Sequence, residues 1–298
     1  MILESKLPFK YLIGIVKYEL AIVLMVGIIT HFSAIRLTEF LPVMPLAIPA
    51  FLGTSISVLL SFKMNQSYDR WWEARKIWGA IVNDSRSLVI QLQSFLSFEH
   101  TDIIKRISYR QIAWCYSLGR SLRGSPRPID HLDHLITTTD DAQISKHNNC
   151  NLAMLQLTAA DIRELRLNNA IDMHGQIHLQ ETIIRLTDSM GGAERISKTV
   201  FPSTYRLILH FIIYLFVITL AISLKGTNNV FVIPLLLLIS AGFFCIEKIA
   251  FHLQDPFRNL PSDIPVTDIA RTIEVNIRQL LSEEIIPAES KPNDYFVM

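Results

Sequence analysis

The sequence lacks the features that mark disulfide-rich, zinc-binding and nucleic-acid-binding proteins. Its three cysteines, Cys115, Cys150 and Cys245, are odd in number and far apart, and no Cys-x-x-Cys pair occurs, so neither a disulfide framework nor a zinc site is expected. The formal net charge is only +1 and no basic run is longer than two residues. Nucleic acid is therefore not an expected partner.

Signatures of enzymes are also missing from the sequence. It contains no glycine-rich phosphate loop, no Gly-x-Ser-x-Gly elbow and no convincing set of nucleophile and base. The pairs His131/His134 and His174/His178 have spacings suited to sharing a metal ion, but neither lies in a His-Glu-x-x-His frame. We therefore expect no enzymatic activity, no catalytic residue, no cofactor and no metal site.

Charged residues are scarce, at 18% of the chain, whereas hydrophobic residues make up 50%, an oily balance for a soluble protein. Four stretches reach the length of about 20 residues that a helix needs to cross a bilayer. These stretches are residues 11–35, 41–62, 207–224 and 226–246. Pro42, Pro45 and Pro49 interrupt the first half of the second stretch, which predicts a kinked or two-part helix inside a bundle.

The long segment between the two apolar pairs has a different character. In residues 63–206, apolar side chains recur at helical spacing and strand-like alternation is rare, so the predicted fold is all-α. We expect loops at residues 123–128 and 137–149, a break at residues 190–193 and an amphipathic helix at residues 266–281. The predicted domains are a first transmembrane pair (1–63), a cytosolic helical domain (64–206), a second transmembrane pair (207–250) and a C-terminal cytosolic segment (251–298).

The distribution of basic residues predicts the orientation in the membrane. Four spans place both termini and the middle domain on one side of the bilayer, and the short loops on the other side contain only Arg36 and Lys225 of 28 basic residues. Because basic residues are enriched in cytoplasmic loops, the termini and the middle domain are expected in the cytoplasm.

Residues 60–78 are the most distinctive stretch, because an apolar run passes without Gly or Pro into a helix rich in charges and tryptophans. Asp69 and Glu73 follow Phe62 by seven and eleven residues. At about 100° per residue, these spacings bring the three side chains to within about 20° of one direction. Rings of such carboxylates at a channel mouth would favour cations. In the alternative interpretation they pair on neighbouring helices with Arg70, Arg75 or Lys76.

Three motifs carry a resemblance to a known family. Residues 65–79 read Asn-Gln-Ser-Tyr-Asp-Arg-Trp-Trp-Glu-Ala-Arg-Lys-Ile-Trp-Gly, and residues 191–196 read Gly-Gly-Ala-Glu-Arg-Ile. Asp-Pro-Phe at 255–257 is followed by Asp263, Arg271 and Glu274. In these motifs the chain resembles the bestrophin family, and its bacterial branch in particular, over essentially its whole length.

The resemblance implies a homopentameric ion channel of the bacterial inner membrane, with one axial pore. The three positions of the family's membrane neck correspond to Thr54, Val58 and Phe62, and a second, cytosolic constriction corresponds to the region of Ile171 and Met173. The core of the family motif corresponds to Asp69, Arg70, Trp71, Trp72 and Glu73.

The resemblance implies small monovalent ions but leaves the sign of their charge open. Animal bestrophins pass anions, chloride among them, whereas bacterial relatives are associated with monovalent cations. The acidic cluster of calcium-activated members is replaced here by Arg-Asn-Leu-Pro-Ser at 258–262, so calcium activation is not expected. The implied partners are further copies of the chain and membrane lipid. The rival interpretation is a non-conducting membrane scaffold or sensor whose cytosolic helical domain binds a partner.

Overall fold

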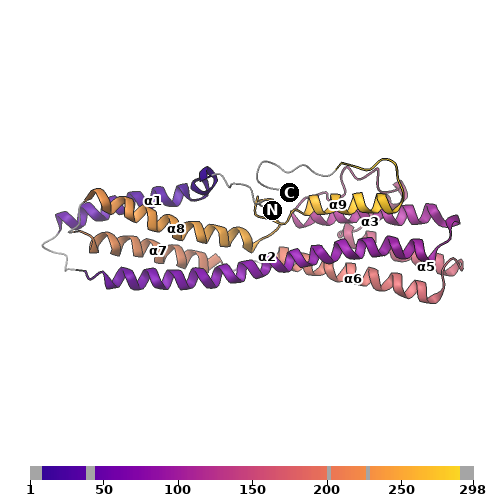
Figure 1. Ribbon diagram of the computed structural model, residues 1–298, viewed down its shortest axis with the longest axis horizontal. Coiled ribbons are helices and arrows are strands. Elements are labelled where there is room, and N and C mark those ends of the chain that lie inside the picture. The colour runs from indigo at the N-terminus through magenta and orange to yellow at the C-terminus, as the bar shows by residue number, and fades with distance from the viewer. Residues whose placement is uncertain (1–8, 38–43, 200–202, 226–228, 289–298) are drawn as a thin grey trace. The chain divides into compact units, whose positions relative to one another are not determined.

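The computed structural model of the protein describes residues 9–37, 44–199, 203–225 and 229–288, and every regular element in these ranges is a helix (Figure 1). The predicted all-α fold is therefore confirmed for the described part of the chain. In chain order the helices are α1 (Phe9–Arg36), α2 (Ala47–Phe95), the short 3-10 helix η1 (Phe98–His100), α3 (Thr101–Leu122), α4 (Thr138–Ile144), α5 (Cys150–Leu167), α6 (Met173–Lys198), α7 (Ser203–Ser223), α8 (Asn229–Gln254) and α9 (Val266–Leu280).

Four of these helices are long and apolar enough to cross a membrane, as the sequence predicts. They are α1, α2, α7 and α8, with apolar segments inside Lys10–Arg36, Ala47–Phe95, Thr204–Ser223 and Phe231–Gln254. The predicted two-part helix is not seen in α2, which is one continuous helix from Ala47; Pro45 lies before it, and Pro42 lies outside the described residues. Pro49 lies in the first turn of α2, where a missing backbone N–H leaves no hydrogen bond unmade.

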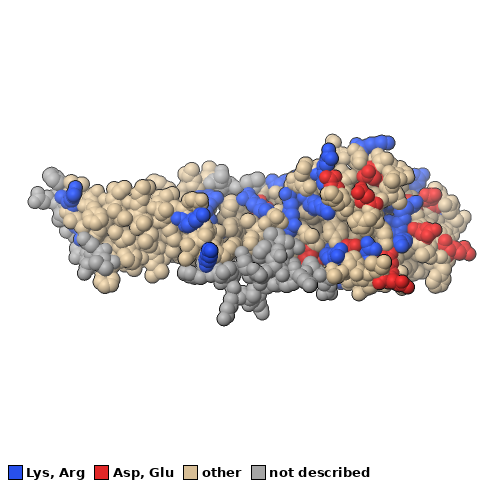
Figure 2. Space-filling view, turned by 90° about the horizontal axis from the view of Figure 1, so that it is seen from above, with Lys and Arg blue, Asp and Glu red and all other residues tan. Residues whose placement is uncertain are grey.

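The described residues divide into two compact units, which we call the apolar unit and the polar unit. The apolar unit comprises the described residues of Ser5–Arg70 and Val200–Asp255, and the polar unit those of Trp71–Thr199 and Pro256–Met298. Charged side chains of both signs cover the polar unit, whereas few appear on the apolar unit (Figure 2). These packing boundaries do not test which residues lie in a membrane, so the four domains expected from the sequence stay a prediction.

The polar unit is held together by a buried ion cluster inside an aliphatic and aromatic core. Arg110 of α3 is 2% exposed, and its guanidinium donates to Asp140 of α4 at 2.7 Å and to Asp161 of α5 at 2.6 Å. A buried arginine is stable only if its charge and its N–H groups are satisfied in this way. One side chain therefore ties three helices together.

A second cluster fastens α9 onto α3. The buried carboxylate of Glu274 accepts hydrogen bonds from Tyr116 at 2.7 Å, from Arg271 at 3.1 Å and from Arg278 at 3.0 Å. Burial raises the pKa of the Tyr116 phenol, and its hydrogen bond to Glu274 adds to this effect. Arg271 and Glu274, two residues of the C-terminal sequence motif, thus have a structural role in this network.

Cys115 is a core residue, as its apolar sequence surroundings suggest. It is fully buried, and this burial raises the pKa of its thiol to about 12, against smaller opposing effects of hydrogen bonds with Ser85 and Gln111. A thiol with so high a pKa stays protonated and unreactive at neutral pH.

Two predicted irregular segments are helical instead. The break expected at residues 190–193 is wrong, because α6 runs through it. Gly192 packs closely there, since a Cβ atom would lie 3.1 Å from Cδ1 of Ile77. Within the expected loop at residues 137–149, α4 forms because the Thr137 hydroxyl caps it by accepting from the backbone N–H of Asp140 at 3.2 Å.

Replacement of the buried guanidinium is expected to destabilise the polar unit strongly. Arg110→Met leaves the carboxylates of Asp140 and Asp161 without their buried partner, which costs on the order of 3–5 kcal/mol. We expect thermal unfolding in detergent, followed by circular dichroism, to begin several degrees lower. The matched control is Arg163→Met on the exposed side of α5, and an equally small loss in both variants would contradict the role given to Arg110.

Candidate pore-lining face of helix α2

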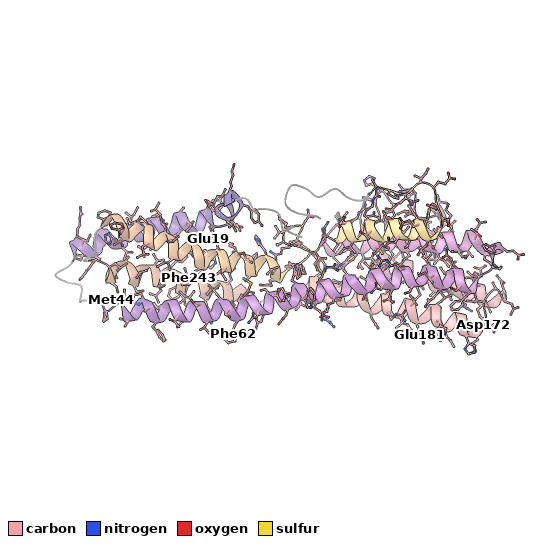
Figure 3. All side chains as sticks on the ribbon, viewed as in Figure 1. Glu19, Met44, Phe62, Asp172, Glu181 and Phe243 are labelled. Atoms are coloured by element: carbon pink, nitrogen blue, oxygen red, sulfur yellow. The ribbon has the colours of Figure 1, made fainter. Side chains whose placement is uncertain are left out.

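The first half of α2 buries one face and leaves the opposite face open. Ile56 and Leu60 are buried in the core of the apolar unit. Thr54 is exposed, Val58 is 49% exposed and Phe62 is 63% exposed. These three residues are four apart, so they form one stripe along the helix, and Phe62 projects from its outer side (Figure 3). We call Thr54, Val58 and Phe62 the neck stripe.

The neck stripe continues into the two predicted carboxylates. Asp69 is exposed, whereas Glu73 is partly buried and its carboxylate lies 2.7 Å from the ammonium of Lys76 on the same helix. The pairing alternative considered for these acids thus applies to Glu73, although with a residue of its own helix. Asp69 remains an exposed negative charge on the line of Phe62.

The back of the Phe62 turn is fixed to α7 and α8 by polar contacts. Lys63 is only 7% exposed, and its ammonium donates to the side-chain oxygen of Gln254. The Tyr205 hydroxyl donates to the backbone oxygen of Leu59 at 2.8 Å. Phe62 and Lys63 are adjacent in sequence, so burying Lys63 keeps Phe62 turned outward.

Two further contacts set the position of α2 along this face. The Arg70 side chain donates to the backbone oxygen of Gln254 at 2.8 Å. At Gly53 a Cβ atom would lie 3.3 Å from the ring of Phe216, so the missing side chain allows α7 to approach α2 directly behind Thr54. The side of α2 opposite the neck stripe is therefore in contact with α7 and α8 at several positions along the helix.

A layer of charges joins the other helices of the apolar unit. Glu247 of α8 is buried, and its carboxylate lies 3.0 Å from Arg206 and 3.5 Å from His210, both of α7. The adjacent Lys248 points to α1, where its ammonium lies 2.5 Å from Glu19. Sequence reasoning ended the fourth span at residue 246 and missed this layer, although consecutive opposite charges directly after an apolar run were a visible signal.

The tryptophans of the motif belong to the polar unit. Trp71 is partly buried against the core, and its indole N–H donates to the backbone oxygen of Ser262 at 3.1 Å. Trp72 is exposed and stacks on Trp71 with ring centroids 6.3 Å apart.

The structure separates the two residues of the predicted cytosolic constriction. Ile171 is 4% exposed and lies in the core of the polar unit, whereas Met173, the first residue of α6, is 63% exposed. Asp172 between them caps α6, accepting from the backbone N–H of Gly175 at 2.7 Å. A side chain as buried as Ile171 cannot line a pore, so the constriction prediction narrows to Met173.

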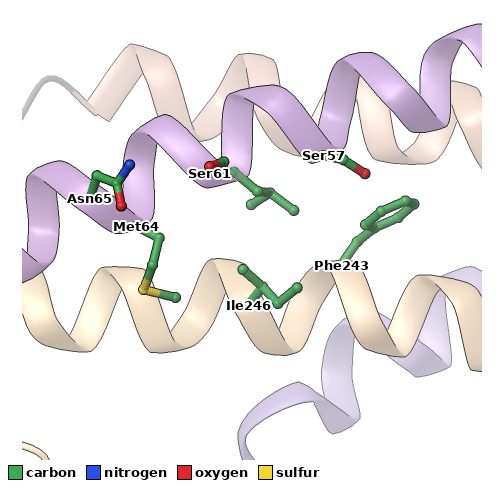
Figure 4. Close-up of a pocket in the computed structure, with 7 residues that line it drawn as sticks. Ser57, Ser61, Met64, Asn65, Phe243 and Ile246 are labelled. Atoms are coloured by element: carbon green, nitrogen blue, oxygen red, sulfur yellow. The ribbon is translucent and has the colours of Figure 1, made fainter.

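A groove runs beside the neck stripe between α2 and α8. Its volume is about 260 Å³, and Figure 4 shows Phe243 and Ile246 of α8 facing the polar side of α2 across it. On the α2 side it is lined by Ser57, Leu60, Ser61, Met64 and Asn65. Exposed hydroxyl and amide groups inside a membrane-length helix are costly against lipid, so this face is suited to contact with protein.

These observations define an all-helical membrane protein with four membrane-length helices and one exposed, partly polar stripe on the second. Residues 11–279 match the family described as bacterial/fungal bestrophin protein, and the chain belongs to this family. The sequence resemblance is thus confirmed.

Relatives and solved structures agree with this assignment. The voltage-dependent anion channel-forming protein YneE of Escherichia coli O157:H7 is 29% identical over 98% of this chain and 92% of its own length. The protein of that name from Salmonella typhi is 31% identical over 82% of this chain and 79% of its own. A crystal structure of a bacterial bestrophin homolog from Klebsiella pneumoniae superposes with a TM-score of 0.84 at 27% identity, covering 91% of this chain and 100% of that one. The relatives are named as channel-forming proteins, in agreement with the prediction that the chain is not an enzyme.

The contact between Lys63 and Gln254 predicts a measurable energetic coupling. Lys63→Met leaves the buried amide of Gln254 without its donor, at a cost of about 1–3 kcal/mol. Gln254→Leu should likewise destabilise the protein, whereas the double variant removes both partners and should recover much of the loss. Thermal unfolding of the wild type, the two single variants and the double variant completes this double-mutant cycle. Losses of stability that simply add in the double variant would show that the two side chains do not act together.

Proposed function

We propose that the protein is a homopentameric ion channel of the bacterial inner membrane that passes small monovalent ions through a neck lined by Thr54, Val58 and Phe62. The observation that carries the proposal is the neck stripe itself, an exposed row of side chains on a membrane-length helix whose other face is fixed in the apolar unit. Membership of the bestrophin family and the channel-forming names of its relatives support it.

The neck stripe suits a pore that excludes water without a plug. Rings of Val58 and Phe62 around an axis would form a hydrophobic constriction that closes to ions by dewetting. The Thr54 hydroxyl donates to the backbone oxygen of Ala50 at 3.0 Å, so it is already satisfied within its own helix. We propose that Thr54 makes the outer ring smaller than an aliphatic ring but only slightly more polar.

Assembly of five subunits would cover the polar groove beside the neck stripe. Lipid cannot satisfy the Ser61 and Asn65 side chains, whereas the α2 helix of a neighbouring subunit can approach closely at Ser57 and Ser61, which are four residues apart. In the same assembly, Met173 of each subunit would form the cytosolic constriction. The segments 64–206 and 251–298 and both termini are proposed to lie in the cytoplasm, and the pairs within 1–63 and 207–250 in the membrane.

The charges below the neck act on ion selectivity in this proposal. Glu73 is neutralised in part by Lys76, which leaves Asp69 as the net negative charge beyond Phe62. A ring of five such carboxylates would raise the permeability of cations relative to anions. The names of the relatives point instead to anions. Substitution of Asp69 therefore distinguishes cation selectivity from anion selectivity.

Removal of the Phe62 ring is expected to increase ion flux. In liposomes loaded with salt, Phe62→Ala should conduct more than the wild type, because a wider neck is easier to hydrate. Phe211→Ala is the matched control, since Phe211 is 65% exposed on α7 and lies outside the stripe. Flux unchanged in Phe62→Ala would contradict the neck, and no flux under any gradient or voltage would favour the membrane scaffold.

Neutralisation of Asp69 is expected to change the reversal potential. Under a salt gradient, Asp69→Asn should shift the reversal potential toward the value for anions, because the negative ring is lost. Asp102→Asn, at an exposed position of α3, should leave it unchanged. The charge-ring proposal fails if the permeability ratios of all three proteins agree.

A further inference from the structure

The outward face of α1 is a continuous stripe that begins with two lysines, continues with apolar side chains and ends near Arg36. Lys10, Gly14 and Lys17 are exposed on one side of the first turns of the helix, and Tyr18 beside them is 71% exposed. The same side continues with exposed Ile22, Met25, Ile29, Phe32 and Ile35. The opposite side of α1 is buried against α7 and α8, through residues such as Val16 and Val23.

Gly14 makes a notch between the two lysines. A Cβ atom at Gly14 would meet nothing within 4 Å, so the helix backbone is open there. Lys10 and Lys17 lie four residues before and three residues after it, roughly 10 Å apart along the axis and on the same side. Long flexible ammonium side chains at this spacing can converge on one anion above the glycine.

In the described part of the chain, neither Lys10 nor Lys17 is paired with an acid. Glu19, the nearest carboxylate in sequence, is turned inward to Lys248 at 2.5 Å. The ammonium of Lys17 lies 4.9 Å from the centre of the exposed Tyr18 ring, an arrangement that keeps a cation beside an aromatic group at the surface. Tyrosine and lysine side chains of this kind are common at the interface between lipid and water.

We propose that this stripe binds an acidic phospholipid, with the headgroup phosphate over Gly14 between Lys10 and Lys17 and an acyl chain along Ile22, Met25 and Ile29. The inference rests on α1 being a membrane helix and does not require ion conduction. Two lysines flank the glycine notch at the start of the apolar face, and this order of paired cations followed by apolar side chains matches a lipid molecule.

A second copy of the chain fits the stripe less well. Glu19 is partly buried and Glu247 is buried, each in an ion pair, Asp69 lies on the stripe of α2, and Asp255 is partly buried directly after α8. The described part of the apolar unit therefore offers no acidic group on an outer apolar face that would pair with Lys10 and Lys17. Acidic lipid supplies the missing negative charge and the apolar chain in one molecule.

The test compares lipid binding in the wild type and four variants of the whole chain. Purified protein is titrated with phosphatidylglycerol or phosphatidylcholine, bound lipid is counted by native mass spectrometry, and thermal stability is followed in parallel. Lys10→Gln/Lys17→Gln should bind phosphatidylglycerol about thirtyfold more weakly, as expected for two contacts of about 1 kcal/mol each. Gly14→Leu keeps both charges but fills the notch, and it should weaken binding of the same lipid several-fold.

Two controls separate this site from general surface charge and from misfolding. Arg36→Gln removes an exposed cation at the other end of α1 and should leave binding within twofold of the wild type. Lys10→Arg/Lys17→Arg keeps the charges and should retain binding. Equal affinity for phosphatidylglycerol in the wild type and the glutamine variant, or an equal loss in Arg36→Gln, overturns the proposal. A changed subunit number with unchanged lipid binding also overturns it, because the face would then belong to a second copy.

Discussion

The burial of Lys63 behind Phe62 is the contact on which the candidate pore depends. A lysine inside a membrane helix is tolerated only if its ammonium finds partners, and here it donates to Gln254 in a pocket that also contains the Tyr205 ring. Because adjacent residues of a helix point about 100° apart, this buried anchor fixes the outward direction of Phe62. The neck stripe is thus determined as much by the polar groups behind it as by its own side chains.

The charged layer of the apolar unit extends the same principle to the other helices. Glu247 and Lys248 are neighbours on α8, but they pair with different helices. The Glu247 carboxylate pairs with α7, and the Lys248 ammonium pairs with α1. Each charge is costly to bury alone, so the two pairs favour this arrangement of the three helices. A buried pair of this kind adds little to overall stability, because desolvation of the two charges offsets their attraction.

Much of the fold follows from the sequence, because hydrophobic length and helical period depend on local patterns. The four spans and the amphipathic α9 are of this kind. The helix break predicted around Gly192 is wrong because a sequence does not distinguish a glycine that ends a helix from one that leaves room for a neighbouring side chain, here Ile77 of α2. The sequence could not show that Ile171 is buried and Met173 exposed. Two apolar residues so close in sequence are placed in the core or at the surface only by tertiary contacts. The neck stripe was expected from the family resemblance, but its anchor at Lys63 was not.

Cysteine accessibility along α2 tests the central claim, that the exposed stripe of this helix lines an aqueous path. In a background with Cys150→Ser and Cys245→Ser, channel currents would be recorded before and after a charged methanethiosulfonate reagent. The account predicts that modification of Val58→Cys changes the current, whereas modification of Leu238→Cys, on an outward position of α8 that is 73% exposed, does not. A current altered through Leu238→Cys but not through Val58→Cys would contradict it.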